Sequence, residues 1–448
     1  MLRSVLLNLC VTAALAGFMP LSGCQEDPVP PAAATPPPTS PPAVSDEATE
    51  TMERLRRHPA MQEAFQTVLD IEPRTLADHI TLTEIPAPPF GEGPRAEVFA
   101  GMLAASGADS VWIDPVGNVI ARIDGRERAR TIAFGAHLDT VFPAGTDVRV
   151  RMQGDTLYAP GIGDDTRGLA VLLAMMRTVE ARQLAFEDDV LLIGTVGEEG
   201  LGDLRGVRHL FGPEGLAIHE FIAIDGGRLG NVINQALGSN RYRVTVEGQG
   251  GHSWGAFGNA NPQHALASIV HFFVEKADPF TANGPKTSYN IGRVEGGTSV
   301  NAIPEKAWME VDMRSVNPDR LAGIDVLLQQ SIEEGLTHQN SLKRRGEALT
   351  VNVESIGKRP SGETSADHPL VQRALAGARS LGGDANLSIS STDANIPISL
   401  GIPAITIGRG GEGGNAHALN EWWINREGHL GIQWALLLMA SQAHLVTD

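Results

Sequence analysis

Short segments that are apolar throughout, each of strand length, alternate with helical segments along most of the chain. Residues 51–69, 94–106 and 166–182 carry apolar side chains at helical spacing, and the last of these segments lies between two of the apolar runs. Strands that are apolar on both faces are typical of parallel sheets covered by helices. The chain is therefore predicted to be an α/β protein with a mainly parallel sheet. The predicted buried strands are Thr131–Ala136, Val190–Val196, Phe221–Ile224 and Ala404–Ile407.

A different pattern occupies residues 238–355. In Arg241–Glu247 apolar and polar residues alternate, which is typical of an antiparallel strand with one exposed face. Strands of this kind and two helical segments follow the order β-α-β-β-α-β. We therefore expect a smaller α+β domain at 238–355, inserted into a main domain formed by residues 49–237 and 356–448. The other segments assigned to the insert are the strands Lys306–Arg314 and Leu349–Ser355 and the helices His264–Lys276 and Pro318–Gly335.

The composition restricts the partners of the chain. Its 448 residues are roughly three times the length of a typical domain, so each part can bury a core of its own. With 35 Lys and Arg against 53 Asp and Glu, the net charge is −18 at pH 7, and no nucleic acid is expected to bind. The two cysteines, Cys10 and Cys24, lie near the N-terminus, so the body of the chain lacks the residues for a disulfide or thiolate site.

Residues 1–23 are expected to be an export signal. Arg3 precedes an apolar stretch that is too short and too interrupted to span a membrane comfortably. The segment Leu21-Ser22-Gly23-Cys24 resembles the lipobox of bacterial lipoproteins, in which the cysteine is acylated and becomes the first residue of the mature chain. An ordinary signal peptide with a chance cysteine is the alternative. The residue after Cys24 is Gln25 and not Asp, which in Gram-negative lipoproteins resembles an outer-membrane rather than an inner-membrane destination.

Residues 24–48 are expected to be a linker. Eight of the fifteen residues 28–42 are proline, which keeps such a segment extended and prevents it from forming a core. We therefore expect an exported protein held at the cell envelope only by its N-terminal lipid. In a Gram-negative cell it is expected on the periplasmic side of the outer membrane.

Acidic and histidine residues gather where the predicted strands end and where a helix begins. Because ligand sites form outside the carboxyl ends of parallel strands, these segments are expected to converge. Several carboxylates beside two histidines are tolerable in one cleft only where cations neutralise them. Nitrogen and oxygen ligands without sulfur suit zinc, with cobalt or manganese as alternatives. The five segments are Gly135–Thr140, Gly163–Thr166, Gly197–Gly200, Ile224–Gly227 and Gly413–His417.

Each of these segments also has a structural explanation when taken alone. An isolated His-x-Asp is more often a hydrogen-bonded pair in a loop, a Glu-Glu pair is usually solvated surface, and Asp-Gly-Gly is usually a turn. Their joint occurrence at strand ends and in loops, in one order along the chain, favours a metal site.

In these segments the chain resembles the M20 family of metallopeptidases and deacylases, over residues 70–448. The resemblance implies two zinc ions in a catalytic domain, interrupted by a smaller domain that serves as a lid and often as a dimerisation surface. The insertion inferred above from the alternation of residues agrees with that organisation. The motifs that carry the resemblance are His137-Leu138-Asp139-Thr140, Gly163-Asp164-Asp165, Gly197-Glu198-Glu199-Gly200, Asp225, Gly251-His252, Gly297–Pro304 and His417.

The resemblance also implies a set of metal ligands. His137 and Asp225 would bind one ion, Glu199 and His417 would bind the other, and Asp164 would bridge the two. The peptide bond after Asp164 is often cis in the family, and a cis bond here would be a costly non-proline one.

Two further acidic residues receive roles from the family pattern. Asp139, two residues after His137, would orient the imidazole and raise its basicity. Glu198 would be the general base, which takes a proton from the water that bridges the metals and later delivers it to the leaving amine. The two cations would lower the pKa of that water and polarise the scissile carbonyl.

The insert contributes three candidates. His252 resembles a histidine that stabilises the tetrahedral oxyanion, often in the partner subunit's site, although a polar residue in a Gly-rich turn is the alternative. Asn301 and Arg314 resemble positions that contact substrate. Arg314 suits bidentate capture of a carboxylate, and a salt bridge at a strand edge is its alternative. A homodimer is expected from the resemblance alone.

The leading hypothesis is a two-metal hydrolase of exopeptidase type that cleaves the peptide bonds of short peptides. In the family, aspartate at position 225 tends to accompany amino-, di- and tripeptidases, whereas glutamate tends to accompany deacylases and glutamate-releasing carboxypeptidases. Thr166 departs from the pattern Asp-Asp-Lys-x-Gly found in many relatives, which leaves the subfamily open. An N-acyl amino acid deacylase with the same site is the alternative. A non-catalytic peptide-binding lipoprotein is a more distant one, because the base and ligand positions all hold competent residues.

Overall fold

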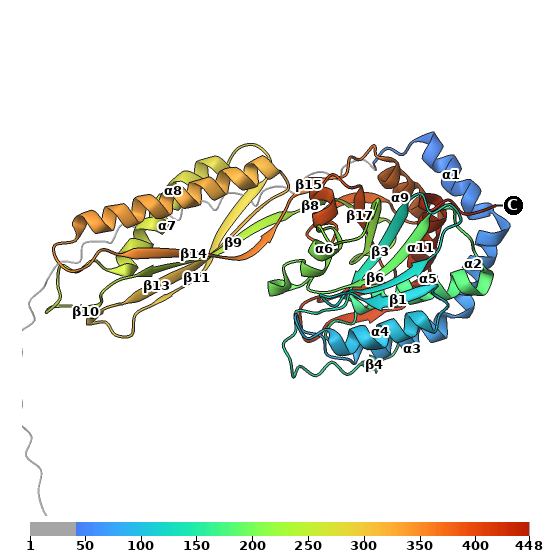
Figure 1. Cartoon of the computed structure of the whole chain (residues 1–448), viewed down its shortest axis with the longest axis horizontal. Coiled ribbons are helices and arrows are strands. Elements are labelled where there is room, and N and C mark those ends of the chain that lie inside the picture. The colour runs from blue at the N-terminus through green and yellow to red at the C-terminus, as the bar shows by residue number, and fades with distance from the viewer. Residues whose placement is uncertain (1–41, 448) are drawn as a thin grey trace, which may run out of the picture. The chain divides into compact units, whose positions relative to one another are not determined.

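The computed structural model describes residues 42–447, and its main domain is built on a nine-stranded sheet (Figure 1). The strands are β1 (Ser110–Ile113), β2 (Val119–Ile123), β3 (Thr131–His137), β6 (Asp189–Thr195), β7 (Glu220–Ile224), β8 (Asn231–Ala236), β15 (Gly362–Glu363), β16 (Asn386–Ser390) and β17 (Ala404–Ile407). Their order is β1-β2-β6-β3-β7-β17-β8-β15, with β16 also paired to β8. The four central strands β6, β3, β7 and β17 are parallel, which confirms the predicted fold class.

Both faces of the sheet are buried, as the continuous apolar strands predict. Every residue of β6 is buried. Val190 and Leu192 belong to one hydrophobic core, whereas Leu191 and Ile193 belong to a second core on the opposite face. The helices of this domain are α1 (Asp46–Arg57), α2 (Pro59–Asp70), α3 (Glu72–Thr83), α4 (Gly93–Ala104), α5 (Thr166–Arg182), α6 (Arg205–Leu210), α9 (Pro369–Ser380), α10 (Asn395–Ser399) and α11 (His429–Gln442), with a 3-10 turn η1 (Gly200–Gly202). Helices α5, α9 and α11 pack on the first core, and α6 and α10 on the second.

The single helix predicted over 51–69 is wrong, because the chain forms α1 and α2 with a break at His58. A residue that precedes proline is disfavoured in the helical conformation, and His58 is extended, with φ −63° and ψ 135°. Pro59 then occupies the first turn of α2, where its missing N–H is tolerated. Helix α1 begins at Asp46, so regular structure starts before the predicted end of the linker at residue 48.

The insert has the predicted order of elements, with two helices on a four-stranded antiparallel sheet (Figure 1). Its elements are β9 (Gly238–Glu247), α7 (Pro262–Thr281), β11 (Thr287–Gly296), β13 (Lys306–Ser315), α8 (Pro318–Leu342) and β14 (Thr350–Arg359). The strand order is β11-β13-β9-β14. Strand β9 begins at the predicted start of the insert, and β14 continues past residue 355 to Arg359. The sequence pattern does not give the bounds of strand β11. It is an edge strand whose residues are mostly exposed, so it has no apolar run.

Two small sheets complete the described part of the chain. Their strands are β4 (Arg151–Gln153), β5 (Thr156–Tyr158), β18 (Glu412–Gly414) and β19 (Trp422–Ile424) in one, and β10 (Gly251–His252) and β12 (Ala302–Ile303) in the other. Within residues 42–447 we find no helix of the length and apolarity needed to cross a membrane. The predicted signal at 1–23, the lipidation site Cys24 and the linker up to residue 41 lie outside the described residues.

Candidate metal centre

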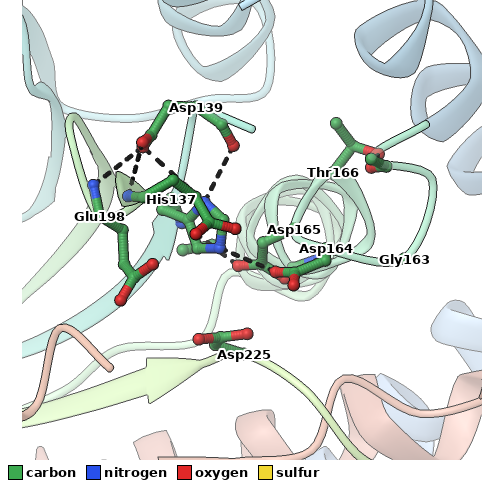
Figure 2. Close-up of polar contacts among 12 residues, drawn as sticks. His137, Asp139, Gly163, Asp164, Asp165, Thr166, Glu198 and Asp225 are labelled. Carbon is green, nitrogen blue, oxygen red and sulfur yellow. Dashed lines mark hydrogen bonds and ion pairs between the residues drawn. The ribbon is translucent and has the colours of Figure 1, made fainter. Parts of the chain in front are cut away.

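The predicted site residues lie where the parallel strands end (Figure 2). His137 is the last residue of β3, Glu198 and Glu199 follow β6, and Asp225 follows β7 directly. Asp164 lies just before the N-terminus of α5. Because β3, β6 and β7 are parallel neighbours, their carboxyl ends share one edge of the sheet. The acidic and histidine segments therefore converge there, as the strand pattern led us to expect.

Three groups of three side chains have the spacing of metal sites, and in each group the candidate ligand atoms lie within 4.8 Å of one another. Asp164 belongs to two of them, which are His137, Asp164 and Asp225, and Asp164, Glu199 and His417; the third is His137, Glu198 and Glu199. The Oδ1 atom of Asp164 lies 3.0 Å from His137 Nε2, and its Oδ2 atom lies 3.2 Å from His417 Nε2. Glu199 Oε1 lies 2.9 Å from the same nitrogen of His417. A carboxylate shared between two groups is what a two-metal centre with a bridging ligand requires.

The charges of these groups fit divalent cations. Hydrogen bonding to Asp164 and Glu199 raises the pKa of His417 to about 10. Burial opposes the charged form of His137, yet its hydrogen bond to Asp164 raises its pKa well above the usual value. Burial, followed by repulsion from Asp164, raises the pKa of Asp225 to about 6. Crowded carboxylates beside two imidazoles suit neutralisation by cations, and nitrogen and oxygen donors of this kind suit zinc, cobalt or manganese.

Asp139 holds the loop that carries the two glutamates (Figure 2). Its Oδ1 atom accepts a hydrogen bond from the backbone N–H of Glu198 at 3.0 Å, and Oδ2 accepts one from the N–H of Glu199 at 2.7 Å. The Nδ1 atom of His137 lies 3.0 Å from the backbone carbonyl oxygen of Asp139 and 3.8 Å from its carboxylate. Asp139 therefore orients the imidazole chiefly through its carbonyl group, whereas its carboxylate fixes the glutamate loop.

The N-terminus of α5 is fixed by Asp165. The peptide bond between Asp164 and Asp165 is cis. The buried carboxylate of Asp165 caps α5 and accepts a hydrogen bond from the backbone N–H of His137 at 3.2 Å. Burial, followed by the charge of Asp225, raises its pKa well above the usual value. The buried guanidinium of Arg409 offsets part of this negative charge, since its Nη1 atom lies 3.7 Å from Asp225 and 3.9 Å from Asp165.

Several buried charged residues hold the segments that carry the site, although none of them belongs to a motif recognised in the sequence. Arg95 donates hydrogen bonds to the carbonyl oxygens of Leu138 and Ile85, each at 2.6 Å, and so holds the segment next to Asp139. Its position on the apolar face of α4, four residues before buried Phe99, is the signal that could have identified it. Arg409 and Glu421, and Arg359 on the cavity wall, are further buried charged residues that the sequence patterns did not indicate.

The centre borders a cavity of about 800 Å³ whose wall includes Arg241, Arg314 and Arg359. Arg241 and Arg314 lie on the neighbouring strands β9 and β13. Their Nε atoms donate to the two oxygens of Asp312, at 2.8 and 2.7 Å. Arg314 thus forms a salt bridge with Asp312, which was the alternative to a role in substrate binding. It also lines the cavity, where its guanidinium can bind an anionic group.

His252 and Asn301 are not among the residues that line this cavity. They lie together where β10 pairs with β12, since the N–H of Ser253 donates to the carbonyl oxygen of Asn301 at 2.9 Å. Both residues are exposed, and nearby Trp254 is 88% exposed. Their roles toward substrate stay predictions.

The sequence has relatives among known proteins. Residues 133–440 match the model of peptidase family M20/M25/M40. An uncharacterised protein of Bacillus subtilis, YqjE, is 25% identical over 369 residues, which cover 78% of this chain and 93% of that protein. A succinyl-diaminopimelate desuccinylase of Corynebacterium glutamicum is 29% identical over 249 residues, 53% of this chain and 66% of the relative.

Solved structures share the fold. A tripeptidase from Staphylococcus aureus superposes with a TM-score of 0.69 at 22% identity, over 83% of this chain and 98% of that one. The YXEP protein of Bacillus subtilis, described as a dinuclear metal-binding peptidase of the M20 family, superposes with a TM-score of 0.61 at 18% identity, over 84% of this chain and 99% of that one. At these identities the likeness establishes the fold alone.

Proposed function

Because the chain belongs to peptidase family M20/M25/M40, a family of hydrolases, we propose that it is a two-metal exopeptidase that cleaves short peptides. The observation that carries the proposal is the position of Asp164, whose two oxygens each face the imidazole of a different ligand group. In this proposal His137 and Asp225 would hold one cation, Glu199 and His417 would hold the other, and Asp164 would contribute to both sites.

Each side chain of the site then has its own role in hydrolysis. Two divalent cations, when bound, supply Lewis acidity that lowers the pKa of water and polarises the scissile carbonyl. Glu198 lies on the cavity wall, takes a proton from the attacking water and passes it to the leaving amine. Asp139 keeps Glu198 and Glu199 in place through their backbone N–H groups. Arg314 pairs with a carboxylate of the bound peptide.

A second candidate is an N-acyl amino acid deacylase that uses the same residues. The relative named as a succinyl-diaminopimelate desuccinylase supports it, because it is 29% identical over the matched part. Asp225 supports the peptidase instead, by the family tendency described above. Both reactions break an amide bond, so they differ only in what the cavity accepts beside the metal centre.

Metal analysis combined with a substrate panel tests the proposal. We expect about two divalent cations per chain, with zinc as the first candidate and cobalt or manganese as alternatives. The purified protein should hydrolyse di- and tripeptides faster than N-acetyl or N-succinyl amino acids. Activity on acylated amino acids alone would reject the peptidase in favour of the deacylase. Glu198→Ala should abolish turnover and keep the metal content, and unchanged turnover would remove Glu198 from the mechanism.

We also propose a homodimer in which the insert of each subunit presents His252 to the other subunit's centre. The exposure of His252 and of neighbouring Trp254 supports this arrangement.

We further propose that the protein is an envelope lipoprotein acylated at Cys24, which the N-terminal sequence supports. Metabolic labelling with a fatty acid tests that anchor, and labelling that persists in Cys24→Ala would contradict it.

A further inference from the structure

Arg359 connects the insert to the glutamate proposed as general base. It is the last residue of β14, the strand by which the insert returns to the main domain. Its Nη1 atom donates to Glu198 Oε1 at 2.8 Å and to Ser391 Oγ at 3.0 Å, and its Nη2 atom donates to the backbone carbonyl oxygen of Glu198. The side chains of Arg359 and Glu198 are only 8% and 7% exposed. Within residues 42–447, no other side chain hydrogen bonds the Glu198 carboxylate.

We propose that Arg359 is a positioning residue that fixes the orientation of the Glu198 carboxylate. This inference rests on the proposed function of Glu198 as the base. The terminal torsion of a glutamate has broad, two-fold preferences, so a free carboxylate presents its oxygens in many directions. A charge-assisted hydrogen bond to Oε1 removes that freedom and leaves Oε2 for the attacking water. Because proton transfer needs hydrogen-bonding distance at a defined angle, this orientation contributes to kcat.

The guanidinium also fixes the main chain of the same residue. Since Nη2 binds the Glu198 carbonyl while Nη1 binds its carboxylate, one planar group holds both ends of the glutamate. A lysine has a single ammonium group, so it can meet the carboxylate but cannot reproduce the two-point arrangement. This difference makes the lysine variant informative.

A neighbouring arginine provides a matched control. Arg208 donates to the carbonyl oxygen of Lys358, the residue before Arg359, and the N–H of Lys358 donates to Asp203 Oδ1 at 2.9 Å. Arg208 therefore fastens the same strand end to the main domain, but it makes no contact with Glu198. Substituting Arg208 removes a cation and a contact with the end of β14, but it leaves the hydrogen bonds from Arg359 to Glu198 in place.

The test compares Arg359→Met, Arg359→Lys and Arg208→Met in the full-length mature protein, on an amide substrate that the wild type hydrolyses. We expect Arg359→Met to lower kcat about 10- to 100-fold with KM changed less than about twofold. Arg359→Lys should recover part of the loss, and Arg208→Met should stay within about twofold of wild type. Metal content should be the same in all. A loss in Arg359→Met that matches Arg208→Met, or one confined to KM, would overturn the inference.

A double-mutant cycle separates this inference from the proposed function. Glu198→Gln should reduce kcat strongly, and adding Arg359→Met to it should cost nothing more, because Arg359 acts through Glu198. Additive losses would contradict the positioning role. Wild-type kcat in Glu198→Gln would instead refute the proposed function. If Arg359→Met proves too unstable to purify, Arg359→Lys decides by the same comparison of kcat with KM.

Discussion

The buried carboxylate of Glu421 accepts a hydrogen bond from the backbone N–H of Asp164, with 2.8 Å between Oε1 and the nitrogen. The same oxygen accepts from the N–H of Gly163 at 2.8 Å, and Oε2 accepts from the N–H of Gly161 at 2.7 Å. Burial raises the pKa of Glu421, while these backbone donors act to lower it. Glu421 therefore holds the turn that presents Asp164 to both ligand groups.

Glu421→Gln should weaken the binding of divalent cations about 10- to 100-fold. A carboxamide has one acceptor oxygen in place of two, and its NH₂ group would face a backbone N–H. Competition with a chelator of known affinity measures the change. The exposed Glu214→Gln serves as the control and should bind as the wild type does. Equal affinities in the two variants would show that the turn does not depend on Glu421.

Asp164→Asn should abolish most of the stabilisation that cations give the fold. At a free cation concentration of 100 Kd, one site stabilises the native state by about 2.7 kcal/mol. Because Asp164 belongs to two of the ligand groups whereas Asp225 belongs to one, Asp225→Asn should lose less of this stabilisation. Thermal unfolding with added zinc and with excess chelator measures the difference. A wild-type response in Asp164→Asn would contradict the bridging role.

Arg314→Met should raise KM for peptides with a free C-terminal carboxylate about tenfold and leave kcat nearly unchanged. In the proposed mode of binding, Arg314 contacts the carboxylate equally in the ground state and the transition state, so its loss affects binding alone. Peptides with a C-terminal carboxamide provide the comparison, since the wild type and the variant should handle them alike. An equal rise in KM for both kinds of peptide would show that Arg314 does not bind the C-terminal carboxylate.

His79 should make the fold sensitive to acid. Its Nε2 atom lies 2.6 Å from the carbonyl oxygen of Ile162, and its buried Nδ1 atom has no partner among the described residues. Burial, followed by the charge of Arg167, lowers its pKa to about 3. The unfolded chain protonates near pH 6.5, so between about pH 6.5 and 3 it binds more protons than the native state. Stability is therefore retained above that window and falls as the pH decreases through it.

His79→Gln should reduce this dependence, because glutamine can donate to the same carbonyl group and does not titrate. Below pH 6 the wild type should lose up to about 1.4 kcal/mol per pH unit more than the variant. Urea unfolding at pH 7.5, 6.0 and 5.0 gives the slopes. The exposed His264→Gln should keep the wild-type slope, and the same slope in His79→Gln would refute the assignment.

The features predicted from the sequence are those that leave a local signal. Continuous apolar runs identified β3, β6, β7 and β17, and the acidic and histidine motifs lie directly at their ends. Strand β11 lacks such a run because its residues are mostly exposed at a sheet edge. Pro59 marks the break at His58, but the apolar spacing continues across it and therefore predicts a single helix.

The residues around the centre that were not predicted depend on tertiary structure. Arg359 and Glu198 are 161 positions apart, and Glu421 and Asp164 are 257 apart. No spacing rule connects such pairs, because each meets its partner only when β14 or the segment after β18 returns to the sheet edge. Asp139 contacts His137 through its carbonyl oxygen and the backbone of Glu198 and Glu199 through its carboxylate. These contacts likewise depend on how the ends of β3 and β6 meet.

Mixing two inactive variants tests whether His252 acts across a dimer. Glu198→Gln and His252→Ala should each be nearly inactive alone. If His252 serves the other subunit's centre, a mixed dimer contains one centre with both native residues, so random exchange should restore about a quarter of the wild-type activity. Light scattering establishes the dimer, and subunits are exchanged by mild denaturation and refolding with metal. If both residues act within one subunit, mixing restores nothing, and that result would limit His252 to its own chain.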